Sequence, residues 1–217
     1  MQDNLAISWA DSVTGLSSWP RPRYPIVSEA ILPNRVLFWQ GEPQNKEFEI
    51  LEGAVRAVRL CSAGERQVLA FFWPGDTIHS SYMGTPTYTA EAVTHCKVRT
   101  RRLSHNTETG IPVTAHEQVL REMLDLIQGV SRRSALSRIA WFILRMRNHL
   151  PCTDTDPDTF KFIIPRNDIA DHLGLSPETV CRGLMELKRR QAIEMPTRRT
   201  IRFRSVAQVS KIAKCQG

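Results

Sequence analysis

The segment SPETVCRGLMELKRR, residues Ser176–Arg190, combines groups that suit recognition of a polyanion with one thiol that could react. If it forms a helix with about 100° per residue, its side chains separate into two sets. The apolar set is Val180, Gly183, Leu184 and Leu187, and the opposite set, called the reading face below, is Glu178, Cys181, Arg182, Met185 and Arg189. The apolar set can dock on a neighbouring helix, with Gly183 allowing close approach, so the reading face is free to contact a partner.

The reading face carries the donors and acceptors that DNA base edges require. A helix in the major groove turns its N-terminal residues toward the bases. There Arg182 can donate two hydrogen bonds to guanine, and Glu178 can accept one from cytosine, each worth about 1–3 kcal/mol of base discrimination. Cys181 lies beside them as a third predicted base contact. Phosphate contacts give affinity and register without sequence, and the residues predicted for them are Ser176, Thr179, Lys188, Arg189, Arg198 and Arg199.

The distribution of charge favours a polyanionic partner. Of the 217 residues, 29 are Lys or Arg and 22 are Asp or Glu. Residues 161–217 hold twelve of the basic residues and five of the acidic ones, whereas residues 1–160 hold seventeen of each. The whole excess of +7 therefore lies in the C-terminal quarter, an asymmetry typical of nucleic-acid binding. The alternative is a C-terminal unit that binds another protein, with its charges solvated.

The residues around the helix predict a winged helix-turn-helix. Pro165 suits the first turn of a preceding helix and Asp168 suits its positive end, while Gly174 ends it. Ser176 is placed to cap the next helix, with Pro177 in its first position. The sequence AIEMPTRRTIRFRS then predicts two short strands around a basic turn, the wing. Residues 151–159, PCTDTDPDT, read as a polar loop.

The N-terminal half has a different character. Residues 24–105 consist of short β-branched and aromatic segments broken by Gly and Pro, which predicts an antiparallel β-roll. From residue 113 to 148 the pattern becomes helical, first with a coiled-coil-like seam and then with a thicker apolar stretch typical of a buried helix. The seam, called the dimer stripe below, is Leu120, Met123, Leu124, Ile127, Val130 and Ser131.

Several classes of protein find no support in the sequence. Five widely spaced cysteines, none before Cys61, and six scattered histidines argue against a disulfide framework, a metal site or an iron–sulfur cage. No nucleophile motif and no Gly-rich phosphate loop indicate an enzyme. The N-terminus lacks the features of a secretory signal, and no apolar run is long enough to span a membrane. A cytoplasmic protein without a cofactor is therefore expected.

The segment IPRNDIADHLGLSPETVCRGLMELKRRQAIE resembles the DNA-binding segment of the Crp/Fnr superfamily of bacterial transcription regulators. Its recognition motif is similar to the Glu-x-x-Ser-Arg of the Fnr/FixK group, with Cys181 in place of Ser. FFWPGDTIH resembles the Pro-Gly-Asp turn of the family's β-roll, and residues 113–148 fall where the family has its dimerisation helix.

This resemblance implies an α+β protein with three parts. They are an N-terminal antiparallel β-roll of the cyclic-nucleotide-binding type over residues 1–112, a long dimerisation helix and hinge over 113–148, and a C-terminal winged helix-turn-helix over 149–217. It also implies a homodimer that binds double-stranded DNA at a palindromic operator with TTGA-like half-sites mirrored as TCAA, contacts RNA polymerase and acts mainly as an activator. In the FixK branch the target genes concern microaerobic respiration, nitrogen fixation or denitrification.

The residues that bind an effector in other members of the family differ in this chain. The segment PGDTIHSSYMGTPTYTAEAV lacks both the Gly-Glu and the Arg that cyclic-nucleotide-binding members use, so a cyclic phosphate would have no charge partner there. The N-terminal cysteines of cluster-binding Fnr proteins are also absent. The expectation is a regulator that works without a small-molecule effector. The alternative is an effector-responsive regulator with a cyclic nucleotide, a haem bound through a histidine such as His79, or another ligand in the β-roll.

Cys181 has two interpretations. In the first, Cys replaces Ser at similar size and has no redox role. In the second, the thiol is a redox switch: close to Arg182 and to the positive end of its helix, it should form thiolate readily. Oxidation would then add bulk and charge against the DNA and abolish binding.

Overall fold

A computed structural model describes residues 27–62, 64–79, 85–102, 113–132, 134–150, 152–153 and 156–214 of the chain. The predictions about the N-terminus and about the segment SSYMG, residues 80–84, concern residues outside these ranges. None of the described helices combines the length and the apolar character that crossing a membrane would require.

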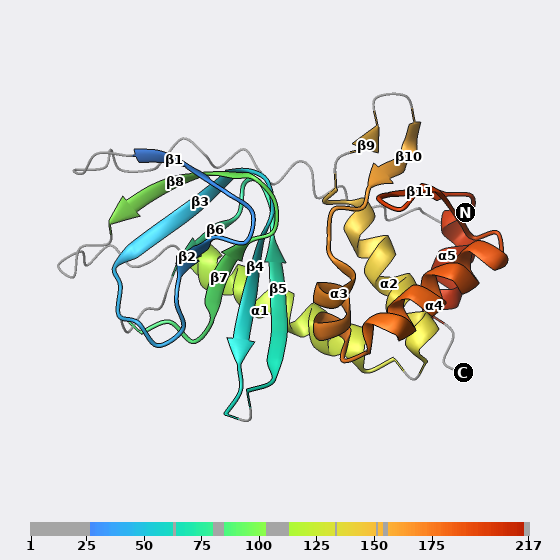
Figure 1. Ribbon diagram of the computed structural model, residues 1–217, viewed down its shortest axis with the longest axis horizontal. Coiled ribbons are helices and arrows are strands. Elements are labelled where there is room, and N and C mark those ends of the chain that lie inside the picture. The colour runs from blue at the N-terminus through green and yellow to red at the C-terminus, as the bar shows by residue number, and fades with distance from the viewer. Residues whose placement is uncertain are drawn as a thin grey trace, which may run out of the picture.

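The N-terminal part is an antiparallel β-roll built from two four-stranded sheets (Figure 1). The first sheet has the order β1-β8-β3-β6 and the second β2-β7-β4-β5. The strands are β1 (Val27–Ile31), β2 (Val36–Phe38), β3 (Lys46–Glu52), β4 (Val55–Leu60), β5 (Arg66–Phe72), β6 (Thr77–His79), β7 (Thr89–Ala92) and β8 (Cys96–Arg102). The predicted β-roll is therefore confirmed.

Alternation of side chains along the strands builds the interior of the roll. In β8, Cys96, Val98 and Thr100 are buried while Lys97 is exposed, as a strand with one solvated face requires. The interior is filled largely by aromatic rings: the ring centroid of Phe38 lies 6.0 Å from that of Phe48 and 5.4 Å from that of Tyr88. The Tyr88 hydroxyl donates to the carbonyl of His79 at 3.2 Å, and burial raises its pKa.

Two helices lead from the β-roll to the C-terminal part. Helix α1 (Val113–Val130) runs behind β4 and β5 in Figure 1 and is followed by α2 (Ala135–Arg147). The hydroxyl of Ser134 caps α2 by accepting from the amide of Ser137 at 3.1 Å. Helix α1 passes so close to α2 that a Cβ on Gly129 would fall 2.2 Å from the indole of Trp141. Glycine at this position is therefore what permits the two helices to meet.

The C-terminal unit is a winged helix-turn-helix, as predicted. Helices α3 (Arg166–Leu173) and α4 (Pro177–Arg189) are followed by strands β11 (Ile193–Thr197) and β12 (Thr200–Phe203), which form the wing. Helix α2 packs against α4 and against the terminal helix α5 (Val206–Lys214). The proposed limits of the three domains, at 112/113 and 148/149, stay predictions.

Two features of this unit differ from the sequence reading. The prediction of a loop over 151–159 is wrong in part, because β9 (Cys152–Thr153) and β10 (Asp156–Lys161) form a hairpin there. Strand β10 also pairs with the wing, Phe160 opposite Ile201, and this long-range pairing overrides the turn-forming residues. Helix α5 was not predicted, and it contributes Val209 to the core.

The β-roll and the C-terminal unit share one hydrophobic core. Phe71, Trp73 and Val93 of the roll are buried in the same cluster as Phe142 of α2 and Leu173 of α3. The ring centroid of Phe71 lies 6.0 Å from that of Phe142, and both rings pack edge-on against the buried imidazole of His172. The C-terminal unit is thus packed on the β-roll through apolar contacts.

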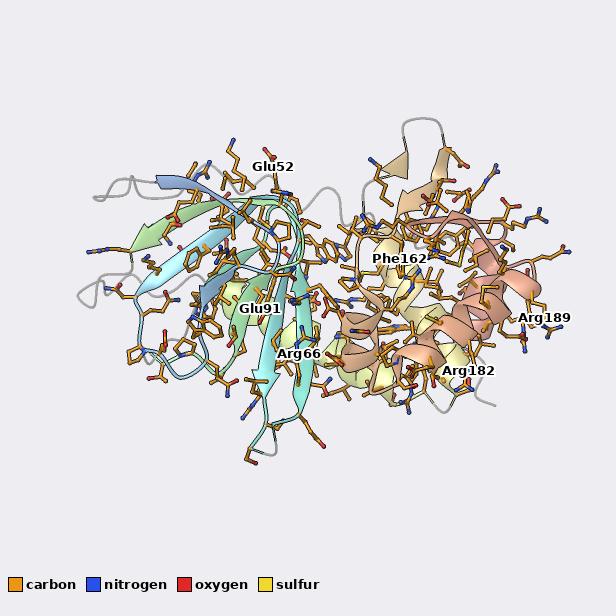
Figure 2. The ribbon with its side chains drawn as sticks, viewed as in Figure 1. Glu52, Arg66, Glu91, Phe162, Arg182 and Arg189 are labelled. Atoms are coloured by element: carbon orange, nitrogen blue, oxygen red, sulfur yellow. The ribbon has the colours of Figure 1, made fainter. Side chains whose placement is uncertain are left out.

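An ion cluster, called the interdomain clamp below, also joins the β-roll to α3; Figure 2 labels two of its members, Arg66 and Glu91. Its members are Arg56, Arg66, Glu91, Asp168 and Asp171. Arg56 donates to Asp168 at 2.5 Å and to Glu91 at 2.8 Å, and Arg66 donates to Asp168 at 3.0 Å and also bonds Asp171. The Asp168 side chain is only 4% exposed, and its two oxygens are paired with these two arginines.

Candidate DNA-binding surface

The turn between α3 and α4 sets the position of the reading face. Gly174 adopts the left-handed conformation, with φ of 63°, and the amide of Leu175 bonds the carbonyl of Ala170, which ends α3. The Ser176 hydroxyl then accepts from the amide of Thr179 at 3.2 Å and caps α4, with Pro177 in the first turn. The predicted cap and helix start are confirmed.

Helix α4 docks by its apolar side. Val180, Leu184 and Leu187 are at most 2% exposed. A Cβ on Gly183 would lie 2.3 Å from Cδ1 of Ile139, so this glycine lets α4 approach α2 closely. The helix is therefore held rigidly with its opposite side toward solvent.

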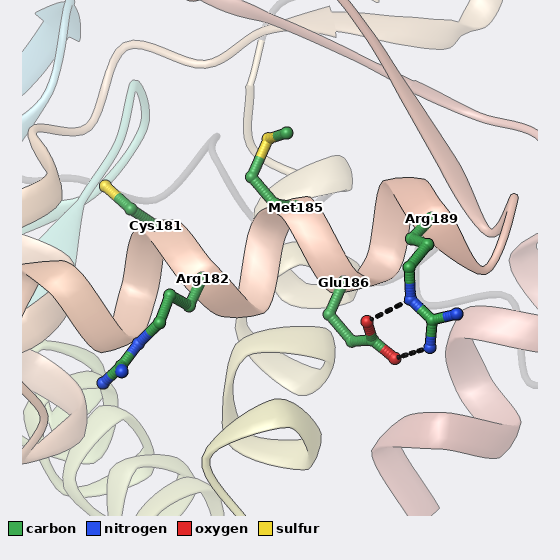
Figure 3. A pocket seen from close by; sticks show the side chains of 5 residues that line it. All are labelled: Cys181, Arg182, Met185, Glu186 and Arg189. Carbon is green, nitrogen blue, oxygen red and sulfur yellow. Dashed lines mark hydrogen bonds and ion pairs between the residues drawn. The ribbon is translucent and has the colours of Figure 1, made fainter.

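The structure brings the three predicted base contacts together on that open side. Glu178, Cys181 and Arg182 are all exposed, and Figure 3 shows Cys181 and Arg182 projecting from adjacent positions of α4. The guanidinium of Arg182 donates to the Thr179 hydroxyl at 3.3 Å, and that hydroxyl lies 3.0 Å from the Ser176 hydroxyl. Ser176 and Thr179, predicted as phosphate contacts, thus also orient Arg182.

Local hydrogen bonds favour the ionised form of Glu178. Its own backbone amide, the Ser176 hydroxyl and then the charge of Arg182 lower the pKa of the Glu178 carboxyl. At neutral pH this residue is an acceptor only, which is the form that a cytosine amine requires.

The predicted phosphate contacts occupy two neighbouring elements. Lys188 and Arg189 lie in the last turn of α4, and Arg198 and Arg199 form the turn of the wing; all four are exposed. Arg189 is already paired: its Nε and Nη2 donate to the two oxygens of Glu186 at 2.7 and 2.8 Å, as the dashed lines in Figure 3 show. Glu186 therefore competes with any phosphate for this guanidinium.

Arg166 also belongs to this surface and was missed in the sequence. Its guanidinium lies 4.4 Å from the centre of the Phe162 ring and donates to the carbonyl of Arg198 in the wing at 3.3 Å. Burial lowers the pKa of Arg166, and its electrostatic interaction with Cys181 opposes that effect. A basic residue in the first turn of a helix, where the dipole disfavours it, was the available signal.

The dimer stripe lies on a separate element. On α1, Leu120, Leu124 and Ile127 are 57%, 56% and 61% exposed. Met123 and Val130 are half-buried, and Ser131 is exposed just after the helix. Large apolar side chains thus line one exposed face of α1.

The chain matches two family models, one for each part of the molecule. Residues 29–105 match the cyclic nucleotide-binding domain and residues 137–212 match the Crp-like helix-turn-helix domain. Over 171 residues the chain is 31% identical to the nitrogen fixation regulation protein FixK of Rhizobium meliloti, covering 78% of this chain and 79% of the relative. It is 27% identical to the transcriptional activator protein Anr of Pseudomonas aeruginosa, covering 67% of this chain and 64% of that one.

A solved structure agrees with these matches. FixK2 from Bradyrhizobium japonicum superimposes with a TM-score of 0.77 at 26% identity, covering 89% of this chain and all of the other. With two domains in the same order and the reading face in place, the chain belongs to the Crp/Fnr family of DNA-binding transcription regulators, in its FixK-like branch, a family of regulators and not of enzymes.

Proposed function

We propose that this chain is a homodimeric transcription activator that recognises TTGA-like palindromes without a small-molecule effector. The observation that carries the proposal is the joint exposure of Glu178, Cys181 and Arg182 on a helix whose other side is fully docked. Acting in the cytoplasm with RNA polymerase, it would control genes of microaerobic or anaerobic respiration, nitrogen fixation or denitrification. The names of its FixK and Anr relatives support this choice of targets.

Each half-site would be read by one copy of α4. Arg182 donates to guanine O6 and N7, and Glu178 accepts from the N4 amine of a cytosine in the other strand. Cys181 packs against the base edges on the other side of Glu178 from Arg182. The hydroxyls of Ser176 and Thr179 and the cations Lys188, Arg189, Arg198 and Arg199 contact phosphates on both sides of the groove.

A dimer supplies the second half-site. The exposed apolar stripe on α1 supports pairing with the same stripe of a second copy, since a two-fold axis brings identical surfaces together. The proposed domain limits, at 112/113 and 148/149, separate the β-roll, the dimerisation helix and the winged helix-turn-helix.

Two observations support action without an effector. Phe38, Phe48 and Tyr88, each at most 5% exposed, occupy the interior of the roll, and residues 67–96 contain no Lys or Arg to bind a phosphate. The shared core and the interdomain clamp also hold the DNA-binding unit on the β-roll through the chain's own side chains. The rival proposal, an effector-responsive regulator, rests on the match to the cyclic nucleotide-binding domain.

A footprint separates the two proposals. Purified protein should protect both half-sites of a TTGA palindrome with no ligand added, and cAMP should leave the protection unchanged. Arg182→Ala should abolish protection, whereas Arg59→Ala, a change in an exposed arginine of the β-roll, should not. Protection that appears only with a cyclic nucleotide, or none on the TTGA site, would overturn the proposal.

We also propose that oxidation of Cys181 switches binding off. The thiol is exposed, and Cys181 directly precedes the cationic Arg182 in α4. Peroxide would convert its thiolate to sulfenic acid, one peroxide oxygen going to sulfur and the other leaving as hydroxide. The added oxygen would stand between the protein and the DNA.

The test compares wild type with Cys181→Ser, which keeps the size of the side chain. Wild type should lose operator binding after peroxide and regain it after reduction, whereas Cys181→Ser should keep binding throughout. Cys181→Asp should fail to bind even when reduced. Equal loss in wild type and Cys181→Ser would refute the redox switch without affecting the proposed operator.

A further inference from the structure

Met185 is the one large apolar side chain that the fold leaves exposed among the described residues from 135 onward. It is 58% exposed, while the docking side of the same helix is complete without it, since Val180, Leu184 and Leu187 are buried. Core packing therefore does not account for Met185, whose side chain is free to contact a partner of the helix.

Its position is the centre of the reading face. Counted from Glu178 at about 100° per residue, Cys181 lies at about −60°, Met185 at about −20°, Arg189 at about +20° and Arg182 at about +40°. Figure 3 shows Met185 and Cys181 projecting side by side from one edge of α4, with Arg182 on the other edge. Met185 also lines the same surface hollow as Cys181 and Arg182.

The direction of a helical side chain brings Met185 to the bases. Long side chains lean toward the N-terminus of their helix and cover the turn before their own Cα. Figure 3 shows the Met185 thioether projecting outward from α4 one turn beyond Cys181, next to the surface on which the proposed base contacts are made. Along the axis its Cα lies about 4.5 Å beyond that of Arg182, roughly one base-pair step.

The major groove of DNA offers one kind of partner to an apolar side chain at the position of Met185. Of the base edges exposed in the major groove, the 5-methyl group of thymine is the apolar one. Methionine is unbranched and polarizable, so it adapts to such a contact. We propose that Met185 is a specificity-determining residue that packs on the methyl group of a thymine beside the G·C pair read by Arg182. This inference rests on the proposed function.

The half-site offers three thymines for the contact: the two of TTGA and the one opposite its adenine. The experiment replaces each in turn by deoxyuridine, which differs only in lacking the methyl group, and measures the affinity of wild type and Met185→Ala. At one position wild type should lose about fourfold in affinity, the value of one buried methyl group. Met185→Ala should bind the unmodified thymine operator no more tightly than wild type binds the deoxyuridine operator. Deoxyuridine at that position should not lower the affinity of Met185→Ala any further.

Controls keep the outcomes apart. Met185→Leu should keep the preference for thymine, because its side chain is still apolar. Leu60→Ala, a change in a β-roll residue with a similar exposure of 54%, should behave as wild type at every position. If each deoxyuridine lowers the affinity of wild type and of Met185→Ala by the same factor, the inference about Met185 is wrong. The proposed operator would not be affected by that result. If wild type does not bind the TTGA operator at all, the proposed function itself fails.

Discussion

The carboxylate of Glu186 binds Arg189, a proposed phosphate contact, and the neighbouring Arg190. It accepts from Arg189 at 2.7 and 2.8 Å and from the Nε of Arg190 at 2.7 Å. These hydrogen bonds, first from Arg189 and then from Arg190, lower the pKa of Glu186 to about 2. The competition with phosphate is therefore present at every pH at which the protein works.

Replacing Glu186 by Gln should tighten binding and make it more sensitive to salt. Each guanidinium released to a phosphate adds about 0.9 to the slope of log affinity against log salt. The measurement is the dissociation constant of the operator complex at several salt concentrations. Glu52→Gln removes the same charge from the β-roll surface, where Glu52 faces Lys97 at 3.9 Å. An equal effect of both variants would mean that net charge alone acts.

Much of the site follows from the sequence at the scale of residues. The grouping of Glu178, Cys181 and Arg182, and the cap at Ser176, follow from helical periodicity because these residues are near neighbours in one helix. The contact between Arg56 and Asp168 joins residues 112 positions apart and leaves no local signal. Asp168 lies in the first turn of α3, as its position in the sequence predicts, but its pairing with Arg56 could not be seen there.

At the scale of elements, α1 carries the surface whose role the fold leaves open. It packs on β5 by one side, while Leu120, Leu124 and Ile127 point away from the protein. The seam was visible in the sequence because its spacing is local. The break between α1 and α2 was not located, although the Ser134 cap of α2 is a local signal, whereas the close fit of Gly129 against Trp141 is not.

Ile127→Glu should separate the subunits. The carboxylate on each copy would face the same carboxylate of the other copy across the two-fold axis. Both charges would be buried in the interface without a partner of opposite charge. Light scattering should show monomers, and operator affinity should fall roughly a hundredfold or more because each half-site is then bound singly. Leu60→Glu places the same charge on a similarly exposed leucine of β4 and should leave the dimer intact. A dimeric Ile127→Glu would show that the interface lies elsewhere.

At the scale of the whole molecule, a histidine lies inside the contact between the two domains. His172 of α3 is 3% exposed, and its Nδ1 lies 3.1 Å from the carbonyl of Val68 in β5. Burial lowers the pKa of His172 to about 4, from an ordinary value near 6.5. The native protein therefore holds this imidazole neutral between the two units.

Acidification should weaken the fold through His172. Between pH 6.5 and 4 the unfolded chain binds a proton at this residue that the folded chain does not, so the free energy of unfolding falls as the pH falls. One such group accounts for about 3 kcal/mol over this range. Urea unfolding at several pH values should show a shallower dependence in His172→Gln than in wild type. His95→Gln, at an exposed position, is the control, and identical pH dependences in all three proteins would contradict the prediction.

The hydrophobic core shared by the β-roll and the C-terminal unit restricts how the two parts can be exchanged between proteins. A regulator of this kind invites the construction of chimaeras in which its winged helix is joined to a sensor from another protein. Here such a graft would uncover Phe71 and Trp73 on the roll and would leave Asp168 without Arg56 and Arg66 on the winged helix. A functional chimaera must therefore transfer the facing surface of β4 and β5 with the DNA-binding unit. The two complementary surfaces must be exchanged together, because the winged helix by itself lacks half of its packing.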